Sequence, residues 1–221
     1  MQRDQTHIAS APAADRAAQE FLRKADPVMA RLIDARPGFR PRAWLEELPA
    51  LDAFGALVFQ VVGQQLSVAA TRTILSRLEE RFGGRLPSPA ELLAADPQVL
   101  RASGMSSRKG ATLRALAERF LDGRLSDAAL AGMSDEEVET VLTEVPGVGR
   151  WTASGFLLLA LDRPDVFLSG DLALRRAVAR AYGFDQLPSD EEMDRLAERW
   201  RPYRSLATSY LFASEYEEST Q

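Results

Sequence analysis

Cysteine is absent from the 221 residues of this chain, and histidine occurs once, as His7. The missing thiols exclude disulfides, cysteine nucleophiles, zinc–thiolate sites and cysteine-ligated iron–sulfur clusters. A histidine-based triad or metal site would have to use His7, which lies in a polar N-terminal segment. Long apolar runs are also missing, since none approaches the roughly 18 residues of a membrane span. We therefore expect no membrane contact and no thiol- or histidine-based catalysis.

The N-terminal residues 1–19 are polar and rich in alanine. They lack the apolar core region of a secretory signal peptide. We interpret them as a flexible leader, and residues 217–221 as a short tail. The sequence thus predicts an intracellular protein, either cytoplasmic or associated with the nucleoid, and nothing in it indicates more than a monomer.

Lysine is scarce, because the 27 basic residues are arginines except for Lys24 and Lys109. The formal charge of −5 and the pI of about 5.1 count against nucleic-acid binding, which usually leaves a basic footprint. The distribution of charge matters more than its sum, however. Arginines gather between residues 150 and 204, and acidic residues form clusters of their own, for example at 135–137 and 215–218. A local basic face is therefore compatible with an acidic chain.

Convincing alternating strands are missing, and apolar residues recur with helical spacing, as in Leu113, Leu116 and Phe120. Ser-x-x-Glu capping boxes, in which a hydroxyl and a carboxylate each satisfy an orphan backbone donor, mark helix starts. They are Ser134 with Glu137, and Ser189 with Glu192. Short connectors containing Gly or Pro separate about ten such helices. The sequence predicts an all-α fold.

We expect two helical subdomains. One is discontinuous and combines residues 20–50 with 164–216, and the other comprises residues 51–163. The irregular stretch 162–170 is interpreted as the crossing between them. Because ligand clefts commonly lie between two halves of a protein, we expect the active site in the cleft between these subdomains.

The most informative segment is a helical hairpin over residues 136–160. A first helix runs into Val145-Pro146-Gly147-Val148-Gly149, and the following helix, 151–161, is apolar nearly all round and hence buried. Two glycines allow a tight turn and the close approach of an anion. The N–H groups and the positive dipole end of the next helix suit a phosphate without any basic side chain. The alternative is an ordinary hairpin whose glycines only cap and turn.

Asp171 stands at the start of an amphipathic helix that carries Leu174, Ala177 and Val178. The simplest interpretation is a helix N-cap, a role in which Asp is favoured. A catalytic role is compatible with that position, because backbone N–H bonds and the helix dipole keep a carboxylate ionised.

Together these segments resemble a known family. The segment Val145–Ala153, with the helix on each side of it, resembles the helix-hairpin-helix element of DNA repair proteins. A lone aspartate about twenty residues later is typical of the helix-hairpin-helix–Gly/Pro–Asp glycosylase superfamily. Residues 62–67, 165–168 and 198–205 make the chain most similar to the 3-methyladenine DNA glycosylase II branch. The resemblance covers roughly residues 52–216.

The resemblance implies an enzyme that flips alkylated bases, of the 3-methyladenine or 7-methylguanine type, out of double-stranded DNA. Asp171 would be the catalytic carboxylate that stabilises positive charge on the sugar. Trp151 occupies the position at which lyase-competent relatives carry a lysine, and the two lysines, Lys24 and Lys109, are expected to lie far from the motif. A monofunctional glycosylase that leaves an abasic site is therefore expected.

The resemblance also assigns a base pocket and a DNA-binding surface. Pocket positions are Trp151, Phe212, Gly155 and Leu172. Two of them, Gly155 and Leu172, replace family aromatics, which predicts a wider pocket with a broader or shifted substrate range. DNA contacts are expected from Gln65, inserted into the gap left by the flipped base, from Gln64 and Ser67 beside it, and from the N–H groups of Gly147, Gly149 and Thr152.

No cofactor is expected to be required, and an iron–sulfur cluster is excluded. Hairpins of this family often bind a monovalent cation, Na⁺ or K⁺, through carbonyls, here those of Thr143, Val145 and Val148. Arginines 175, 176, 201 and 204, and Arg108 with Lys109, either contact phosphates or form solvated helix faces.

Several alternatives remain open. Trp151 could pack in the core, and Gln64, Gln65 and Ser67 could form a polar helix end. The chain could be a glycosylase for oxidised or deaminated bases, or a non-catalytic helix-hairpin-helix module. It could also be a helical interaction domain without a nucleic-acid partner.

Overall fold

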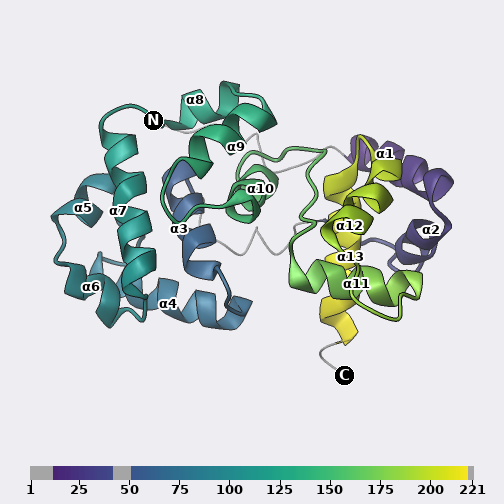
Figure 1. The fold of residues 1–221 in the computed structure, drawn as a ribbon, viewed down its shortest axis with the longest axis horizontal. Helices are drawn as coiled ribbons and strands as arrows, with labels where there is room; N and C mark the ends of the chain where they lie inside the picture. The colour runs from purple at the N-terminus through teal and green to yellow at the C-terminus, as the bar shows by residue number, and fades with distance from the viewer. Residues whose placement is uncertain (1–11, 42–50, 219–221) are drawn as a thin grey trace. The chain divides into compact units, whose positions relative to one another are not determined.

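A computed structural model describes residues 12–41 and 51–218 of the chain (Figure 1). Within these ranges it contains α-helices and a 3₁₀ turn but no strand, as predicted. The helices are α1 (Pro12–Ala25), α2 (Pro27–Asp34), α3 (Ala53–Gly63), α4 (Val68–Arg81), α5 (Pro89–Ala94), α6 (Pro97–Ala102), α7 (Ser107–Leu121), α8 (Asp127–Gly132), α9 (Asp135–Thr143), α10 (Arg150–Leu159), α11 (Leu172–Tyr182), α12 (Asp190–Ala197), η2 (Glu198–Trp200) and α13 (Arg204–Glu218).

The prediction of about ten helices is too low for the described residues. Three of the helices, α5, α6 and α8, have six residues each, too few for a periodic apolar pattern to reveal them. Among the described residues, no helix is both long enough and apolar enough to cross a membrane.

The chain forms two units. One combines residues 1–46 with 164–221 and is called the terminal unit below; the other, residues 47–163, is called the hairpin unit. In the hairpin unit, α3 packs against α4, α7 and α10. Its sequence, AFGALVFQVVG, is apolar except for Gln60, because neighbouring helices cover it almost completely.

The terminal unit is built on the pairs α1–α2 and α11–α13. Its core includes Trp200 and Tyr210, which are fully buried. The carboxylate of Asp26 lies in this core with an exposed fraction of 0%. It caps α2 by accepting the N–H of Val28 at 2.8 Å, and it also accepts hydrogen bonds from Tyr182 Oη at 2.7 Å and from Trp200 Nε1 at 3.0 Å. This buried carboxylate ties together three segments of the unit.

The predicted ends of the fold need correction. Residues 12–19 are not a flexible leader, because α1 begins at Pro12. Its buried Ala18 and Leu22 are four residues apart and give the helix an apolar face that packs. The tail is also shorter than predicted, since α13 continues to Glu218. The remaining leader residues, including His7, lie outside the described residues.

Helix starts agree with the predicted capping. The two capping boxes at Ser134 and Ser189 are confirmed, and a third joins Ser88 to Glu91 at the start of α5. Each satisfies two backbone donors that a helix start would otherwise leave unpaired.

Candidate functional site

The turn between α9 and α10 has a shape that only glycine permits at its centre. The N–H of Val148 donates to the carbonyl of Val145 at 3.0 Å, and Gly147 between them has a φ of +90°. Proline followed by a residue with positive φ is typical of a type II turn. A Cβ at Gly147 would also lie 2.1 Å from Thr112 Oγ1. Any side chain at this position is therefore excluded twice, by φ and by its neighbour.

Gly149 differs from Gly147. It is the N-cap of α10, with φ −107° and ψ 177°, and it provides no side-chain cap to that helix. A Cβ added there would meet nothing within 4 Å. The first-turn N–H groups of α10 thus donate no hydrogen bond to a side chain of the cap residue, which is the arrangement that suits an anion.

Two other segments hold the hairpin from behind its turn. Gln64, which ends α3, donates through Nε2 to the carbonyl of Gly147 at 3.0 Å and to Thr152 Oγ1 at 2.9 Å. From α7, Thr112 Oγ1 donates to the carbonyl of Pro146 at 2.9 Å. The structure therefore brings together Gln64, Gly147 and Thr152, three of the residues predicted from the sequence.

Lys109 corrects an expectation, because in space it is not far from the motif. Its Nζ donates to the carbonyls of Val62 and Gln64, both at 2.8 Å, at the end of α3. Partial burial lowers the pKa of this ammonium below its ordinary value of 10.5. Lys109 thus contacts Gln64, and Gln64 in turn contacts the hairpin. Sequence separation concealed this contact.

The segment that follows Gln64 is exposed. Gln65 has a φ of +57°, which is uncommon for a residue other than glycine. Leu66 and Val68 are 40% and 47% exposed, an unusual place for large apolar side chains. Ser67 caps α4 by accepting the N–H of Ala70 at 3.2 Å. The segment presents an unusual backbone and apolar surface, features that a polar helix end does not require.

In the terminal unit, Asp171 is the N-cap of α11, as its sequence position predicts. Its Oδ1 accepts the N–H of Leu174 at 2.9 Å, and its side chain is half-buried. The cap fixes one carboxylate oxygen at the positive end of the helix.

The loop before Asp171 is held by a second aspartate whose role sequence reasoning missed. Arg204 Nε donates to Asp165 Oδ1 at 2.7 Å, and Arg201 donates to Asp165 Oδ2 at 2.8 Å. Ser205 Oγ accepts the N–H of Val166 at 2.9 Å. The motifs at 165–168 and 198–205 therefore form one cluster that anchors the approach to Asp171.

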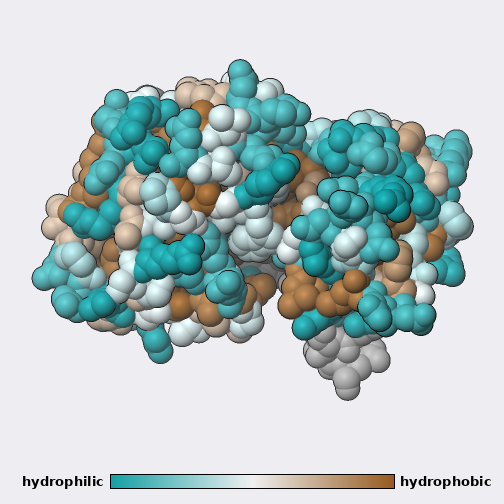
Figure 2. Space-filling model, viewed as in Figure 1, coloured by the Kyte–Doolittle hydropathy of each residue, from teal (hydrophilic) through white to brown (hydrophobic). Residues whose placement is uncertain are grey.

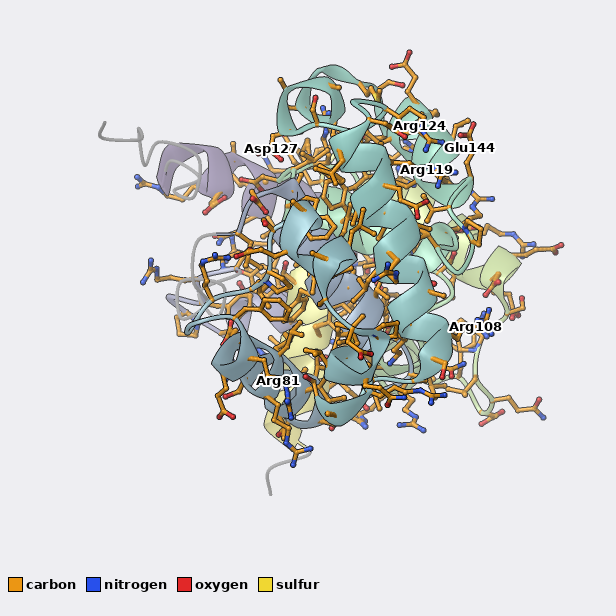
Figure 3. The ribbon with its side chains drawn as sticks, turned by 90° about the vertical axis from the view of Figure 1, so that its left-hand side faces the viewer. Arg81, Arg108, Arg119, Arg124, Asp127 and Glu144 are labelled. Atoms are coloured by element: carbon orange, nitrogen blue, oxygen red, sulfur yellow. The ribbon has the colours of Figure 1, made fainter. Side chains whose placement is uncertain are left out.

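These ion pairs change the interpretation of the arginines. Arg201 and Arg204 bind Asp165, and Arg175 pairs with Asp190 and donates to the carbonyl of Ser169, so none of the three is a simple solvated side chain. In the hairpin unit, Figure 3 shows Arg108 near one end of α7 and Arg119 near the other. Arg108 is exposed at the helix start, four residues before Thr112, which contacts the hairpin turn.

The predicted pocket residues lie in both units. Trp151 is half-buried rather than sealed in the core, and Gly155 is buried one turn further along α10. In the terminal unit, Leu172 is 51% exposed and Phe212 is half-buried on α13. Figure 2 shows apolar surface over α11, the helix that Leu172 begins.

Gly155 does not leave open space. A Cβ there would lie 2.5 Å from Gln60 Oε1 and 2.9 Å from its Cδ. The carboxamide of Gln60, on α3, fills the volume that the missing side chain vacates. This argues against a pocket that is wider at position 155.

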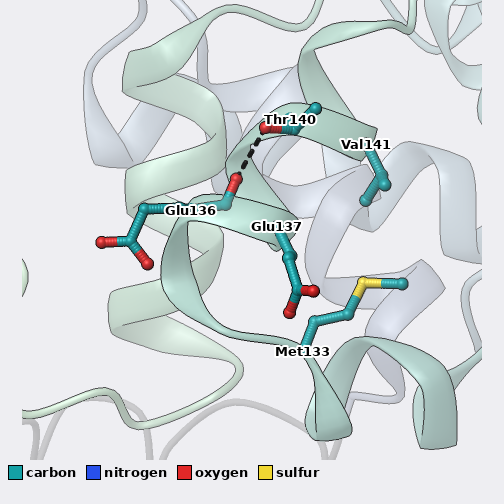
Figure 4. Close-up of a pocket in the computed structure, with 5 residues that line it drawn as sticks. All are labelled: Met133, Glu136, Glu137, Thr140 and Val141. Atoms are coloured by element: carbon teal, nitrogen blue, oxygen red, sulfur yellow. Dashed lines mark hydrogen bonds between the residues drawn. The ribbon is translucent and has the colours of Figure 1, made fainter.

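A separate pocket lies along α9 (Figure 4), lined by Met133, Glu136, Glu137, Thr140 and Val141. Thr140 Oγ1 donates to the carbonyl of Glu136 at 2.8 Å. None of the site residues predicted from the sequence lines it, and its two carboxylates disfavour a phosphate. It does not suit DNA.

The sequence of this chain is similar to those of named DNA repair enzymes. The chain is 35% identical to the DNA-3-methyladenine glycosylase 2 of Escherichia coli over 85% of its own length and 64% of that protein. It is 29% identical to the DNA-3-methyladenine glycosylase 1 of Schizosaccharomyces pombe over 82% of its length and 79% of that protein. The chain thus spans less than two thirds of the Escherichia coli relative.

A solved structure is also similar. The 3-methyladenine DNA glycosylase of Schizosaccharomyces pombe in complex with abasic DNA matches with a TM-score of 0.84 and 28% identity, over 90% of this chain and 97% of that one. The model of the HhH-GPD superfamily base excision DNA repair proteins matches residues 58–202, which include the hairpin, Asp165 and Asp171. The chain belongs to the HhH-GPD superfamily of base excision DNA repair proteins.

Proposed function

We propose that this protein is a DNA glycosylase that flips alkylated bases out of double-stranded DNA and hydrolyses their N-glycosidic bond. The observation that carries the proposal is a hairpin turn whose second helix has no side-chain cap, in a chain whose family match also includes Asp171 at the N-cap of α11. Relatives named as 3-methyladenine DNA glycosylases support the substrate class. The proposed partner is damaged duplex DNA, bound by a monomer.

In the proposed mechanism, the N–H groups of Gly147, Gly149 and Thr152 bind a phosphate, and Gln65 fills the gap left by the flipped base. Gln64 and Ser67 support this segment. Unstacking costs a few kcal/mol, least for a damaged base, and an inserted side chain offsets part of that cost. The extracted base stacks on Trp151, with Phe212 and Leu172 as further pocket residues. A cationic base gains about 0.5–2 kcal/mol on such a ring.

Asp171 then acts on the sugar. As the bond from C1′ to the base nitrogen breaks, the base leaves with the electron pair and positive charge develops on the sugar. The carboxylate stabilises this charge and orients or deprotonates the water whose oxygen bonds to C1′. At ~4 Å and an effective dielectric constant of ~20, the attraction is about 4 kcal/mol. That corresponds to roughly a thousandfold in rate.

We propose a monofunctional enzyme without lyase activity. A Schiff base needs a free amine at the sugar, and Trp151 occupies the position at which lyase-competent relatives carry lysine. Lys109 is the nearby lysine, but its ammonium donates to two carbonyls. Borohydride should therefore trap no covalent complex with abasic DNA. A trapped complex that disappears in Lys109→Met would overturn this point.

A monovalent cation at the carbonyls of Thr143, Val145 and Val148 is a further part of the proposal. Thr143 ends α9, whose last carbonyls have no intrahelical partner and form the negative end of the dipole. The carbonyl of Val145 accepts one hydrogen bond and retains a second lone pair. These donors fit Na⁺ or K⁺. Replacing K⁺ by a large organic cation should lower the melting temperature if they hold it.

The test of the main proposal is base release from methylated duplex DNA. The wild-type protein should release methylated purines and leave alkali-labile but uncut strands, and Asp171→Asn should lose about a thousandfold in rate. Asp96→Asn is the matched control, because Asp96 caps α6 in the same way and lies in the other unit. DNA binding without release by the wild type would favour the non-catalytic module. Release of oxidised or deaminated bases alone would redirect the substrate class.

A further inference from the structure

The carboxamide of Gln60 is the polar group of the hairpin unit for which the mechanism above has no use. It is 5% exposed, and it stands in a helix whose other residues are apolar or glycine. No hydrogen bond joins this amide to another group among the described residues, and its atoms are not among the fully buried polar atoms that lack a partner. The amide is therefore nearly buried but still open to a partner from outside the chain.

The position of this amide relative to Trp151 supplies one. Gly155 follows Trp151 by four residues, so the two share one face of α10. All three terminal atoms of Gln60 lie against the bare backbone of Gly155. A Cβ there would be 2.5 Å from Oε1, 2.9 Å from Cδ and 3.2 Å from Nε2. The glycine thus makes room for a flat amide against α10, one helical turn from Trp151.

We propose that Gln60 is a specificity-determining residue that reads the edge of the base stacked on Trp151, which rests on the proposed function. A carboxamide presents a donor and an acceptor side by side and pairs with a base edge that carries the complementary groups. Rotation of the amide by 180° exchanges its donor and its acceptor. It can therefore pair either with an amino group beside a ring nitrogen or with a ring N–H beside a carbonyl. The remaining exposed fraction of the side chain is the route by which the base edge reaches it.

This contact selects by edge and not by charge. A neutral damaged purine that keeps a ring N–H next to a carbonyl, such as hypoxanthine, meets the amide with both groups. A neutral purine whose edge is bridged by an etheno group, 1,N⁶-ethenoadenine, has no donor there and leaves the amide unpaired. A site built to hydrogen-bond its substrate rejects such an analogue strongly.

The experiment compares release of hypoxanthine and of 1,N⁶-ethenoadenine from otherwise identical duplexes under single-turnover conditions. Gln60→Met keeps the side-chain length without the amide. It should lower hypoxanthine release about tenfold and ethenoadenine release less than about twofold. Gly155→Ala, whose methyl group displaces the amide, should reproduce that selectivity. Gln98→Met, the same change at an exposed position of α6, should alter neither rate. Melting curves show whether each variant is folded.

Two results would overturn the inference: equal changes for both lesions in folded Gln60→Met, or ethenoadenine release by the wild type at least as fast as hypoxanthine release. Release of 7-methylguanine from methylated DNA is measured in parallel. If the wild type releases it while either overturning result appears, the inference about Gln60 fails alone. If the wild type releases none of the three bases, the proposed function fails and this inference falls with it.

Discussion

Two sites of this chain hold their polar groups with different kinds of side chain. In the terminal unit, charged side chains make the contacts, as Asp26 and Asp165 do with donors from distant segments. At the turn of the hairpin, the contacts run from the neutral side chains of Gln64 and Thr112 to backbone carbonyls, and the ammonium group of Lys109 holds the end of α3 in the same way. The ion pair of Arg150 with Glu139, which joins α10 to α9, lies at the surface. Substitutions in the terminal unit should therefore lower stability by leaving buried polar groups without partners. Substitutions at the hairpin should lower it by straining the backbone of the turn.

The largest effect is expected for Asp26→Ala. It would leave the buried Tyr182 hydroxyl and Trp200 indole without their acceptor. Removing one partner from such a buried cluster costs about 3–5 kcal/mol, or roughly 10 °C in melting temperature for a chain of this size. Thermal unfolding measures it. The control is Asp52→Ala, an exposed N-cap in the hairpin unit worth about 1 kcal/mol. Equal losses in the two variants would contradict the contrast between the units.

Gly147→Ala should follow at about 2–3 kcal/mol. Left-handed φ costs an alanine roughly 1–2 kcal/mol, and the contact with Thr112 adds to it. The double variant Gly147→Ala/Thr112→Ala should recover the second part only, since it removes the hydroxyl but keeps φ. Denaturant unfolding of the single and double variants separates the two terms. If the double variant loses as much stability as the sum of the single ones, the clash is not the cause.

Lys109→Met should cost about 1–2 kcal/mol, the value of hydrogen bonds from a charged donor. Lys24→Met is the control. Lys24 is exposed, and its ion pair with Glu20, at 3.9 Å, contributes little to stability. Burial lowers the pKa of Lys109, so the unfolded chain binds this proton more tightly than the folded protein. The stability difference between wild type and Lys109→Met should therefore grow as the pH rises towards 10.5. A difference that shrinks over that range would contradict the assigned burial.

The smallest effect concerns a charged pair on the surface of the hairpin unit. The side chain of Arg85, with Ser88, lowers the pKa of Glu91 to about 2. Glu91 thus supports the fold above its ordinary pKa of 4.5, and loses that contribution as the pH falls towards 2. Arg85→Gln should raise this pKa towards 4.5, measurable by NMR titration. Arg124→Gln, which breaks the pair with Asp122, should leave Glu91 unchanged.

Local chemistry made much of this molecule predictable. Capping boxes, the Pro-Gly turn and the Asp171 cap depend on residues within four positions of one another, so the sequence displays them directly. The helix α1 was missed because an alanine-rich start resembles a polar leader until Leu22 shows its apolar face. Family resemblance, and not periodicity, supplied the substrate class.

Contacts between distant segments could not be predicted in this way. Lys109 meets Gln64 across 45 residues, and Asp165 meets Arg204 across 39. Periodicity cannot show such pairs, because it describes one element at a time. Gln60 did leave a signal, since it is the polar residue in an otherwise apolar helix. Without the position of Gly155, however, its partner surface could not be named.

The two hairpin glycines should differ in their tolerance of mutation. At position 147, every substitution should lower stability, even in an assay that measures folding alone. At position 149 the backbone suits every residue and a side chain has open space, so folded protein should accumulate whatever the substitution. If selection for repair in living cells still required glycine at position 149, the reason would be a contact between Gly149 and a bound partner, and not the folding of the chain. Such a pair of tolerance profiles would place a phosphate of the bound nucleic acid against Gly149 without a crystal of the complex.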